Sequence, residues 1–237
     1  MSFARSRRFG RASAIFIACC LVPLAATAQA PHAPSANPAI IRTPPPVHRQ
    51  PQSEIVLEGL RSFGHFHMFA YSWWSMITTA GVEYDRHTWG RFAGAQMDYV
   101  AEFLPVIVLN QPGKTDAFGD PLGNSRQINR GIGIEPIGLR MMWFSNREVK
   151  PYLIMKGGLF AFTHKALSHN ASYLNFDLQM GLGAEFHIHR RLGFRVGFSD
   201  LHFSDAFMVP SNPGLDSMSI TEGICYHFGG PRRSAVY

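Results

Sequence analysis

Residues 173–188 alternate apolar side chains with polar or glycine residues along their whole length. The even positions, all apolar, are Leu174, Phe176, Leu178, Met180, Leu182, Ala184, Phe186 and Ile188. A side-chain period of two places these residues on one face of a β-strand and the odd residues on the other. Strands of soluble proteins usually have about five or six residues. This stretch therefore predicts an unusually long strand with one wholly apolar face.

The same alternation recurs along the rest of the chain. It is clear in residues 95–104, 192–198 and 217–228, and weaker in residues 54–63, 74–84, 131–144 and 150–162. Together these runs predict eight strands. A bulge or break is expected at Glu135-Pro136, because proline cannot donate a hydrogen bond to a neighbouring strand. The connections near 110–130, 163–172 and 205–215 are longer than those near 85–94, 145–149 and 189–191, so long and short connections tend to alternate.

The N-terminus has the features of a secretory signal peptide. Arg5, Arg7, Arg8 and Arg11 precede the apolar residues 14–26, and Ala28-Gln29-Ala30 then offers a cleavage site of small residues. The apolar core is too short for a comfortable membrane span, so residues 1–30 are predicted to be a cleaved signal. A twin-arginine signal at residues 6–9 and a lipoprotein site at residues 18–19 are weaker alternatives.

Charge and cysteine content exclude several classes of protein. The four arginines of the signal account for most of the formal net charge of +6, which leaves no strongly basic surface for nucleic acid. Cleavage would remove Cys19 and Cys20, so the remaining Cys225 could form no intrachain disulfide. Residues 31–52 are predicted to be a proline-rich linker, residues 53–229 the folded domain, and residues 230–237 a C-terminal tail.

A secreted chain with long strands, apolar on one face and polar on the other, is typical of an outer-membrane protein. The predicted fold class is all-β, an eight-stranded antiparallel up-and-down transmembrane β-barrel. Trp73, Trp74, Trp143 and Tyr152 lie near predicted strand ends, where aromatic residues meet the membrane interface. Eight strands enclose an interior that side chains fill, so no wide pore is expected.

Three polar residues near the C-terminus have the composition of a hydrolytic site. His202 and Ser204 lie two residues apart on the seventh predicted strand, so both side chains leave the same face. Asp216 opens the eighth strand, which returns beside the seventh. A serine, a histidine base and an acid that orients the histidine are the parts of nucleophilic acyl transfer. The parity of all three residues matches that of the apolar face, which predicts that they face lipid beside the fourth extracellular loop.

This stretch resembles the outer-membrane lipid A 3-O-deacylase (acyloxyacyl hydrolase) family. The family signature is His-x-Ser-Asn, then an Asn and a Gly, then an acid fourteen residues after the histidine; here His202, Ser204, Asn212, Gly214 and Asp216 match it. The resemblance covers roughly residues 53–229. It implies an esterase that needs no cofactor and removes an acyl chain from lipid A, with Ser204 as nucleophile, His202 as base and Asp216 as orienter.

The sequence departs from the family pattern at two positions. Asp205 replaces the usual Asn that helps to bind the oxyanion, and a carboxylate there would oppose a developing negative charge. Asp216 is one methylene shorter than the frequent Glu. The alternative function is therefore a non-catalytic outer-membrane barrel with a structural or adhesive role, in which Asp205 marks lost activity.

Other candidate ligands are less specific. His65-x-His67 and His187-x-His189 have no recognisable third ligand nearby, so no metal site is expected. Lys114, Arg126, Arg130 and Lys165 are expected in outer loops, where they could meet lipid A phosphates or simply be solvated. The sequence leaves open whether the barrel is a monomer or a homodimer.

Overall fold

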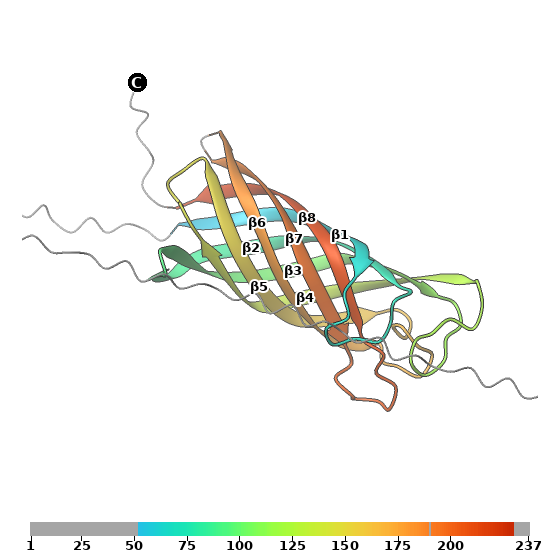
Figure 1. The fold of residues 1–237 in the computed structure, drawn as a ribbon. Helices are drawn as coiled ribbons and strands as arrows, with labels where there is room; N and C mark the ends of the chain where they lie inside the picture. Colours follow the sequence, from blue (N-terminus) through green and yellow to red (C-terminus); the bar gives the residue numbers. More distant parts are fainter. Residues whose placement is uncertain (1–51, 190, 230–237) are drawn as a thin grey trace, which may run out of the picture. The chain divides into compact units, whose positions relative to one another are not determined.

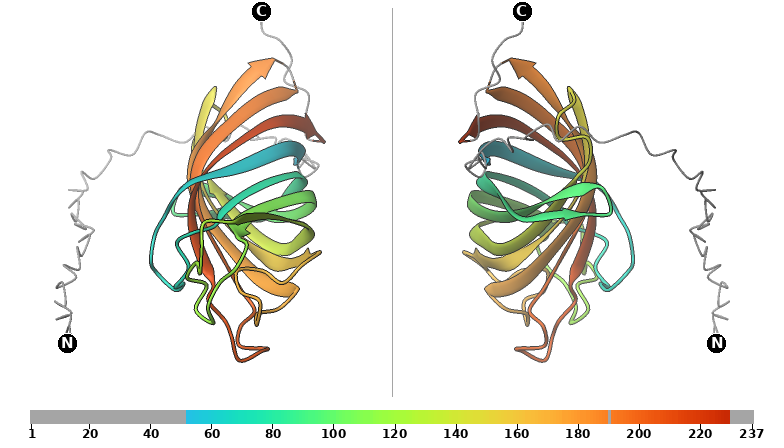
Figure 2. Two further views of the ribbon diagram at one scale, coloured as in Figure 1. Left: turned by 90° about the vertical axis from the view of Figure 1, so that its right-hand side faces the viewer. Right: turned by 90° about the vertical axis from the view of Figure 1, so that its left-hand side faces the viewer.

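The computed structural model describes residues 52–189 and 191–229. Eight antiparallel strands pair in chain order, and β8 pairs with β1 to close the barrel (Figures 1 and 2). The strands are β1 (Ser53–His65), β2 (Met76–Phe92), β3 (Ala95–Pro112), β4 (Arg126–Met142), β5 (Val149–Phe162), β6 (Leu174–His189), β7 (Leu192–Ser204) and β8 (Leu215–Phe228). Among the described residues no helix is long and apolar enough to span a membrane. The predicted signal peptide, nearly all of the predicted linker and the predicted tail lie outside the described residues.

The eight predicted strands are confirmed, although several are longer than the sequence indicates. β2 continues to Phe92, through most of the connection predicted at 85–94. Ala93 and Gly94 make the turn with φ angles of 48° and 78°. Two successive positive φ angles suit a tight hairpin, because such a turn matches the twist of the strands that it joins.

Four longer connections gather at one end of the barrel, here called the loop end (Figure 1). They are the first loop (66–75), the second loop (113–125), the third loop (163–173) and the fourth loop (205–214). The opposite end, here called the hairpin end, joins β2 to β3, β4 to β5 and β6 to β7. The alternation of long and short connections is thus confirmed, and the fourth loop joins the two strands that carry the candidate catalytic residues.

Outward positions are apolar and inward positions are largely polar, as the period of two predicts. In β6, Leu182 is 57% exposed on the outer wall, whereas Glu185 is fully buried in the lumen. The prediction that Tyr152 belongs to an interfacial aromatic belt is wrong. Its position in β5 has inward parity, and its ring lies in the lumen with the Arg195 guanidinium 5.3 Å from the ring centroid.

Side chains fill the lumen, as eight strands predict. Toward the loop end the filling is apolar and consists of Leu60, Ile77, Leu104, Ile107, Leu109, Phe160, Phe162, Ala166, Leu167, Leu201, Phe203 and Leu215. Further along, the Lys156 ammonium lies 3.0 Å from Glu58 and 2.8 Å from Glu83, and it also contacts Glu102. Arg140 and Arg195 pair with further carboxylates toward the hairpin end. The interior is therefore a packed core with a large ionic part.

Candidate active site

His202 and Asp216 meet on the outer wall at the loop end. They are direct partners in the β7–β8 ladder, and that ladder has no register shift. His202 Nδ1 lies 2.5 Å from Asp216 Oδ1. Asp216 therefore reaches the imidazole although it is shorter than the Glu frequent in the resembling family. A carboxylate bound to Nδ1 fixes the orientation of the ring and leaves Nε2 for another partner.

The first loop covers Asp216. The backbone N–H groups of Met68, Phe69 and Ala70 all donate to its Oδ2, at 2.7, 2.6 and 2.9 Å. Asp216 is therefore only 2% exposed, although its parity is that of the outer wall. Three N–H donors to one oxygen stabilise the ionised carboxylate. The sequence alone did not indicate this support, because backbone donors leave no side-chain signature.

Ser204 ends β7 on the same outer face as His202. Both side chains are partly exposed, while the residues between and beside them, Leu201 and Phe203, are buried in the lumen. The outward parity predicted for His202 and Ser204 is confirmed. Two residues along a strand span about 6.6 Å at the backbone, a separation that side chains leaving the same face can bridge. Ser199, another serine of β7, lies at a position of opposite parity; it faces the lumen and is 7% exposed.

The fourth loop holds its two ends together through Asn212. Its Oδ1 accepts a hydrogen bond from the Asp205 backbone N–H, at 3.0 Å. Gly214 has a φ of +61°, and a Cβ there would lie 3.2 Å from the Ala70 Cβ and 3.6 Å from His202 Cε1. Glycine is favoured at this position by its positive φ and by the close approach of Ala70. Asn212 and Gly214 thus support the loop geometry that brings the first loop against His202.

Asp205 is nearly buried. Its Oδ1 accepts a hydrogen bond of 3.0 Å from the Phe207 backbone N–H, so the carboxyl group closes a local turn. Burial raises the pKa of the Asp205 carboxyl, and the hydrogen bond from Phe207 only partly offsets this effect. Ala206 and Phe207 both have positive φ angles, of 51° and 61°. The segment directly after Ser204 is therefore a strained turn built around a buried carboxyl group.

Contacts between loops fix the rest of the loop end. Ser211 Oγ in the fourth loop donates to the Ala117 carbonyl at 2.6 Å and lies 3.2 Å from Ser168 Oγ. Ser168 Oγ in the third loop donates to the Asp116 carbonyl at 3.0 Å. These bonds join the second, third and fourth loops. The loops beside the candidate residues are therefore hydrogen-bonded to one another.

The four basic residues named from the sequence divide between one strand and two loops. Arg126 and Arg130 lie in β4 and not in an outer loop, so the expected loop position is wrong for both. Arg126 donates to Oδ1 and to the backbone oxygen of Asn110, at 3.0 and 2.8 Å, which gives it a structural role. Lys114 lies in the second loop and Lys165 in the third, as expected.

The first histidine pair, His65 and His67, contacts backbone oxygens near Asp216. His65 Nδ1 lies 3.3 Å from the Asp216 backbone oxygen, and His67 Nδ1 lies 2.7 Å from the Ala70 backbone oxygen. The His67 ring also lies against Trp73, with 3.5 Å between ring centroids. Both histidines therefore order the first loop around Asp216.

Two groups of described residues have the spacing of metal ligands, and both lie in the lumen. They are Glu54, Glu185 and His227, and Glu58, Glu83 and Glu102. In the second group the Lys156 ammonium already occupies the position that a cation would take. In the first group each carboxylate lies beside one ring nitrogen of His227, at 3.4 and 3.3 Å.

Comparison with known proteins connects this site to a family. A comparison with curated protein sequences returned no match. Among solved structures, the outer membrane enzyme PagL is similar with a TM-score of 0.52 and 16% identity, covering 71% of this chain and 97% of that chain. The outer membrane protein OprG from Pseudomonas aeruginosa has a TM-score of 0.44 and 10% identity, covering 76% of this chain and 96% of that chain.

The family comparison is the more specific result. The model of the lipid A 3-O-deacylase family (PagL) matches residues 62–224, which run from the end of β1 to near the end of β8. The barrel is accordingly an outer-membrane protein. Because the match spans most of the described residues and includes both strands of the candidate site, the chain belongs to the lipid A 3-O-deacylase (PagL) family.

Proposed function

We propose that this barrel is an esterase that removes a 3-O-linked acyl chain from lipid A by means of Ser204, His202 and Asp216. The observation that carries the proposal is the His202–Asp216 pair on the outer wall, with the carboxylate buried under three backbone donors. Buried polar groups on a lipid-facing wall are costly and are usually functional. All three side chains come from one chain, so the proposed site needs no second barrel.

The proposed mechanism uses the free ring nitrogen of His202. Nε2 takes the proton from Ser204 Oγ as the oxygen attacks the ester carbonyl. Asp216 keeps Nδ1 protonated and stabilises the imidazolium. His202 then protonates the sugar oxygen as its bond to the acyl carbon breaks, so the sugar leaves as an alcohol and the acyl group stays on Ser204. A water molecule, deprotonated by His202, attacks this acyl-enzyme and releases the fatty acid.

The oxyanion needs a donor other than the side chain of Asp205. The Asp205 N–H is already bound to Asn212 Oδ1. This bond uses Oδ1, and Nδ2 of the same amide carries two N–H donors. We assign Asn212 Nδ2 to the oxyanion, with Asp205 contributing only through the turn that it closes.

The surroundings of the site suit a substrate that stands in the outer leaflet. Large aromatic side chains are exposed on the first and fourth loops, namely Phe66, Phe69, Tyr71, Trp73, Trp74 and Phe207. Aromatic residues of this kind collect at membrane interfaces. The sugar of lipid A would then lie at the level of Ser204 with its acyl chains along the barrel wall. Lys114 in the second loop and Lys165 in the third loop are the residues that we propose to contact its phosphates.

Mass spectrometry of lipid A tests the proposal. Cells that express the wild-type barrel should produce lipid A lacking one ester-linked acyl chain, and cells that express Ser204→Ala should not. Ser199→Ala is the matched control, because Ser199 lies on the same strand but faces the lumen. Identical lipid A from wild type and Ser204→Ala would reject the esterase and favour the structural or adhesive barrel.

We expect Asp205→Asn to raise both thermal stability and activity at neutral pH. Burial raises the pKa of Asp205 in the folded state. Ionisation of Asp205 therefore destabilises the folded protein above that pKa, and it has no effect on stability below the pKa of Asp205 in the unfolded chain. Asparagine keeps the oxygen that accepts from Phe207. The melting temperature should rise by a few degrees at pH 7 and be unchanged near pH 3, and removal of a carboxylate near the oxyanion should raise kcat.

Asp116→Asn is the control for replacing an aspartate that closes a turn of the same kind. Asp116 Oδ1 accepts from the Phe118 N–H at 2.8 Å, in the same i to i+2 pattern, but its side chain is more exposed. Because its carboxyl group is more exposed, Asp116→Asn should raise the melting temperature at pH 7 less than Asp205→Asn does. An equal gain at pH 3 and pH 7 for Asp205→Asn would show that ionisation of Asp205 is not the cause.

A further inference from the structure

Three buried side chains from three strands converge in the lumen at the hairpin end. Glu54 of β1, Glu185 of β6 and His227 of β8 each offer one ligand atom, and these atoms lie within 4.8 Å of one another. His227 Nδ1 lies 3.4 Å from Glu54 Oε1, and His227 Nε2 lies 3.3 Å from Glu185 Oε1. The three residues are 2%, 0% and 8% exposed, respectively. A ligand between them would therefore be shielded from bulk water.

The β-ladders bring this group together, and a glycine leaves room for it. Glu54 and His227 are direct partners in the β1–β8 ladder that closes the barrel, so their side chains on the inner face lie about 5 Å apart. Glu185 stands beyond β7, and the ring of His227 reaches toward it across Gly193. A Cβ on Gly193 would lie 3.1 Å from His227 Nε2, closer than ordinary van der Waals contact. Glycine in β7 thus lets the imidazole lie between Glu54 and Glu185.

The ring nitrogens of His227 have no hydrogen-bond partner among the described residues, although each lies close to a carboxylate. Buried polar atoms normally have such a partner, so its absence calls for an explanation. Two ligands of one tetrahedral metal ion with bonds of about 2.0–2.1 Å lie about 3.3 Å apart. Both nitrogen–oxygen separations match this spacing. The geometry therefore fits side chains gathered around an ion better than it fits hydrogen-bonded pairs.

The lumen holds more acids than cations. Among the described residues its buried cationic side chains are Arg140, Lys150, Lys156 and Arg195. Its buried carboxyl groups are those of Glu54, Glu58, Glu83, Asp85, Asp98, Glu102, Glu135, Asp177 and Glu185. Charges buried away from water are costly unless they are neutralised, so this excess of acids favours an additional cation.

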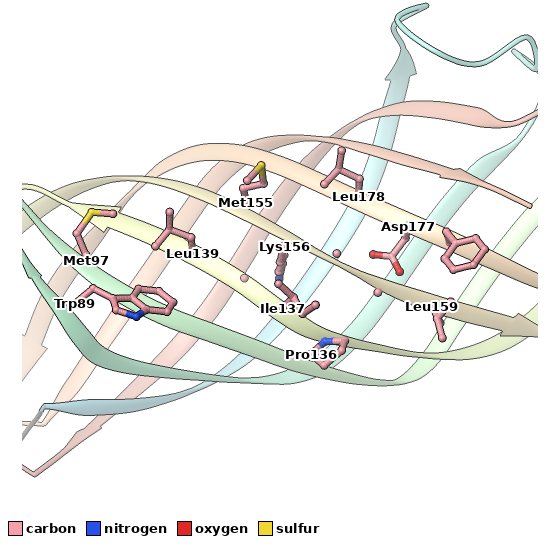
Figure 3. Close-up of a pocket in the computed structure, with 14 residues that line it drawn as sticks. Trp89, Met97, Pro136, Ile137, Leu139, Met155, Lys156, Leu159, Asp177 and Leu178 are labelled. Carbon is pink, nitrogen blue, oxygen red and sulfur yellow. The ribbon is translucent and has the colours of Figure 1, made fainter. Parts of the chain in front are cut away.

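The bulge predicted at Glu135-Pro136 decides which of these charges the lumen contains. The pairing of β4 with β5 shifts register between Ile134 and Ile137, which confirms the bulge. Pro136 and Ile137 are both exposed on the outer wall (Figure 3). Two consecutive outward residues exchange the faces of the strand, so Glu135 before the bulge and Arg140 after it both face the lumen.

The neighbouring cationic side chains occupy one oxygen of each carboxylate. Arg140 Nη1 binds Glu54 Oε2 at 3.0 Å, and Glu54 Oε1 faces His227 Nδ1. Lys150 Nζ binds Glu185 Oε1 at 2.6 Å, and Glu185 Oε2 has no hydrogen-bond partner in the part of the chain that the structure describes. One oxygen of each carboxylate therefore remains to bind an ion.

We propose that Glu54, Glu185 and His227 bind a divalent metal ion, for which Zn²⁺ is the best match. Zn²⁺ takes imidazole nitrogen and carboxylate oxygen ligands, whereas Ca²⁺ needs about six to eight oxygens. The ion binds one nitrogen of the neutral imidazole, and water completes its four ligands. It joins β1, β6 and β8 across the pair of strands that closes the barrel. This role is structural and independent of the proposed function, because the ion stands at the end of the barrel opposite Ser204.

Metal content and melting temperature test this site. The untagged protein in detergent micelles is stripped with EDTA, and Zn²⁺ or Ca²⁺ is then added. We expect about one Zn²⁺ per barrel by mass spectrometry after gel filtration. The melting temperature should rise with free Zn²⁺, because the ion binds the folded state, and should not respond to Ca²⁺. No zinc above that of the detergent blank would overturn the inference, and so would stabilisation by Ca²⁺ equal to that by Zn²⁺.

Two ligand variants locate the ion. His227→Gln and Glu185→Gln should each weaken Zn²⁺ binding by about tenfold or more and remove the zinc-dependent rise in melting temperature. His87→Gln is the matched control, because the ring of His87 lies 3.2 Å from a single carboxylate, that of Asp98, and its loss should leave zinc binding unchanged. Wild-type zinc binding in both ligand variants would place the ion at other histidines and overturn the inference. The esterase proposal and this one can fail separately, since none of these measurements depends on Ser204.

Discussion

Asp216→Asn is expected to lower kcat by about 10⁴. The isosteric amide must place its NH₂ group either against His202 Nδ1 or against the three N–H donors of the first loop. In the first orientation His202 takes the tautomer that carries its proton at Nε2 and cannot accept another there. In the second orientation a donor faces donors in the first loop, and the negative charge that stabilises the imidazolium is lost. Substrate binding should change much less than kcat, because Asp216 is buried and does not touch the lipid. Single-turnover deacylation in detergent micelles measures the effect.

Hydrogen exchange separates the role of Asp216 as partner of His202 from its role as acceptor for the N–H groups of the first loop. In Asp216→Asn the amides of Met68, Phe69 and Ala70 should lose protection, because their shared acceptor is weakened. His202→Ala should abolish turnover and leave these amides protected. Wild-type turnover in Asp216→Asn would show that the carboxylate does not orient the base.

Lys156→Met is expected to lower the free energy of unfolding by about 3–5 kcal/mol, the usual cost of removing one partner from a buried ionic group. The Lys156 ammonium contacts Glu58, Glu83 and Glu102, and Glu135 lies 3.6 Å away. Without it, four buried carboxyl groups face one another in the lumen. Urea unfolding in micelles, followed by tryptophan fluorescence, gives the difference.

Lys150→Met is the matched control for charge and burial. Its ammonium binds Glu185 at 2.6 Å, but Glu185 also lies 3.7 Å from Arg140 and 3.8 Å from Arg195. The carboxylate therefore keeps cationic neighbours, and the loss of stability should be smaller. Glu102→Gln added to Lys156→Met should restore part of the stability. If Lys150→Met and Lys156→Met lower the free energy of unfolding by the same amount, Lys156 is not the centre of the ionic core.

The strands and the direction of the candidate side chains could be predicted because both depend on a local rule. A period of two fixes which face each residue occupies, so the outward parity of His202 and Ser204 followed from Phe194 and Phe198 on the same strand. The bulge at Glu135-Pro136 was predictable for a similar reason, since the missing N–H of proline acts at its own position. These features need only neighbours in sequence.

Features that depend on distant contacts or on strand ends were not predictable. The cover over Asp216 comes from backbone groups 146 to 148 residues away, and no side-chain pattern marks them. Arg126 was assigned to a loop because the start of β4 has no clear alternation. Residue type and nearness to a strand end predict Tyr152 at the membrane interface, whereas its parity in β5 places it inside.

The bonds between the first loop and Asp216 also depend on closure of the barrel. The donors follow the first strand and their acceptor opens the last, so they meet only when β1 pairs with β8 and the ring of strands is complete. In a barrel without the β1–β8 pairing, Asp216 would therefore lack its three backbone donors. In the proposed site, closure of the ring of strands would be needed before this acid is held in place beside His202.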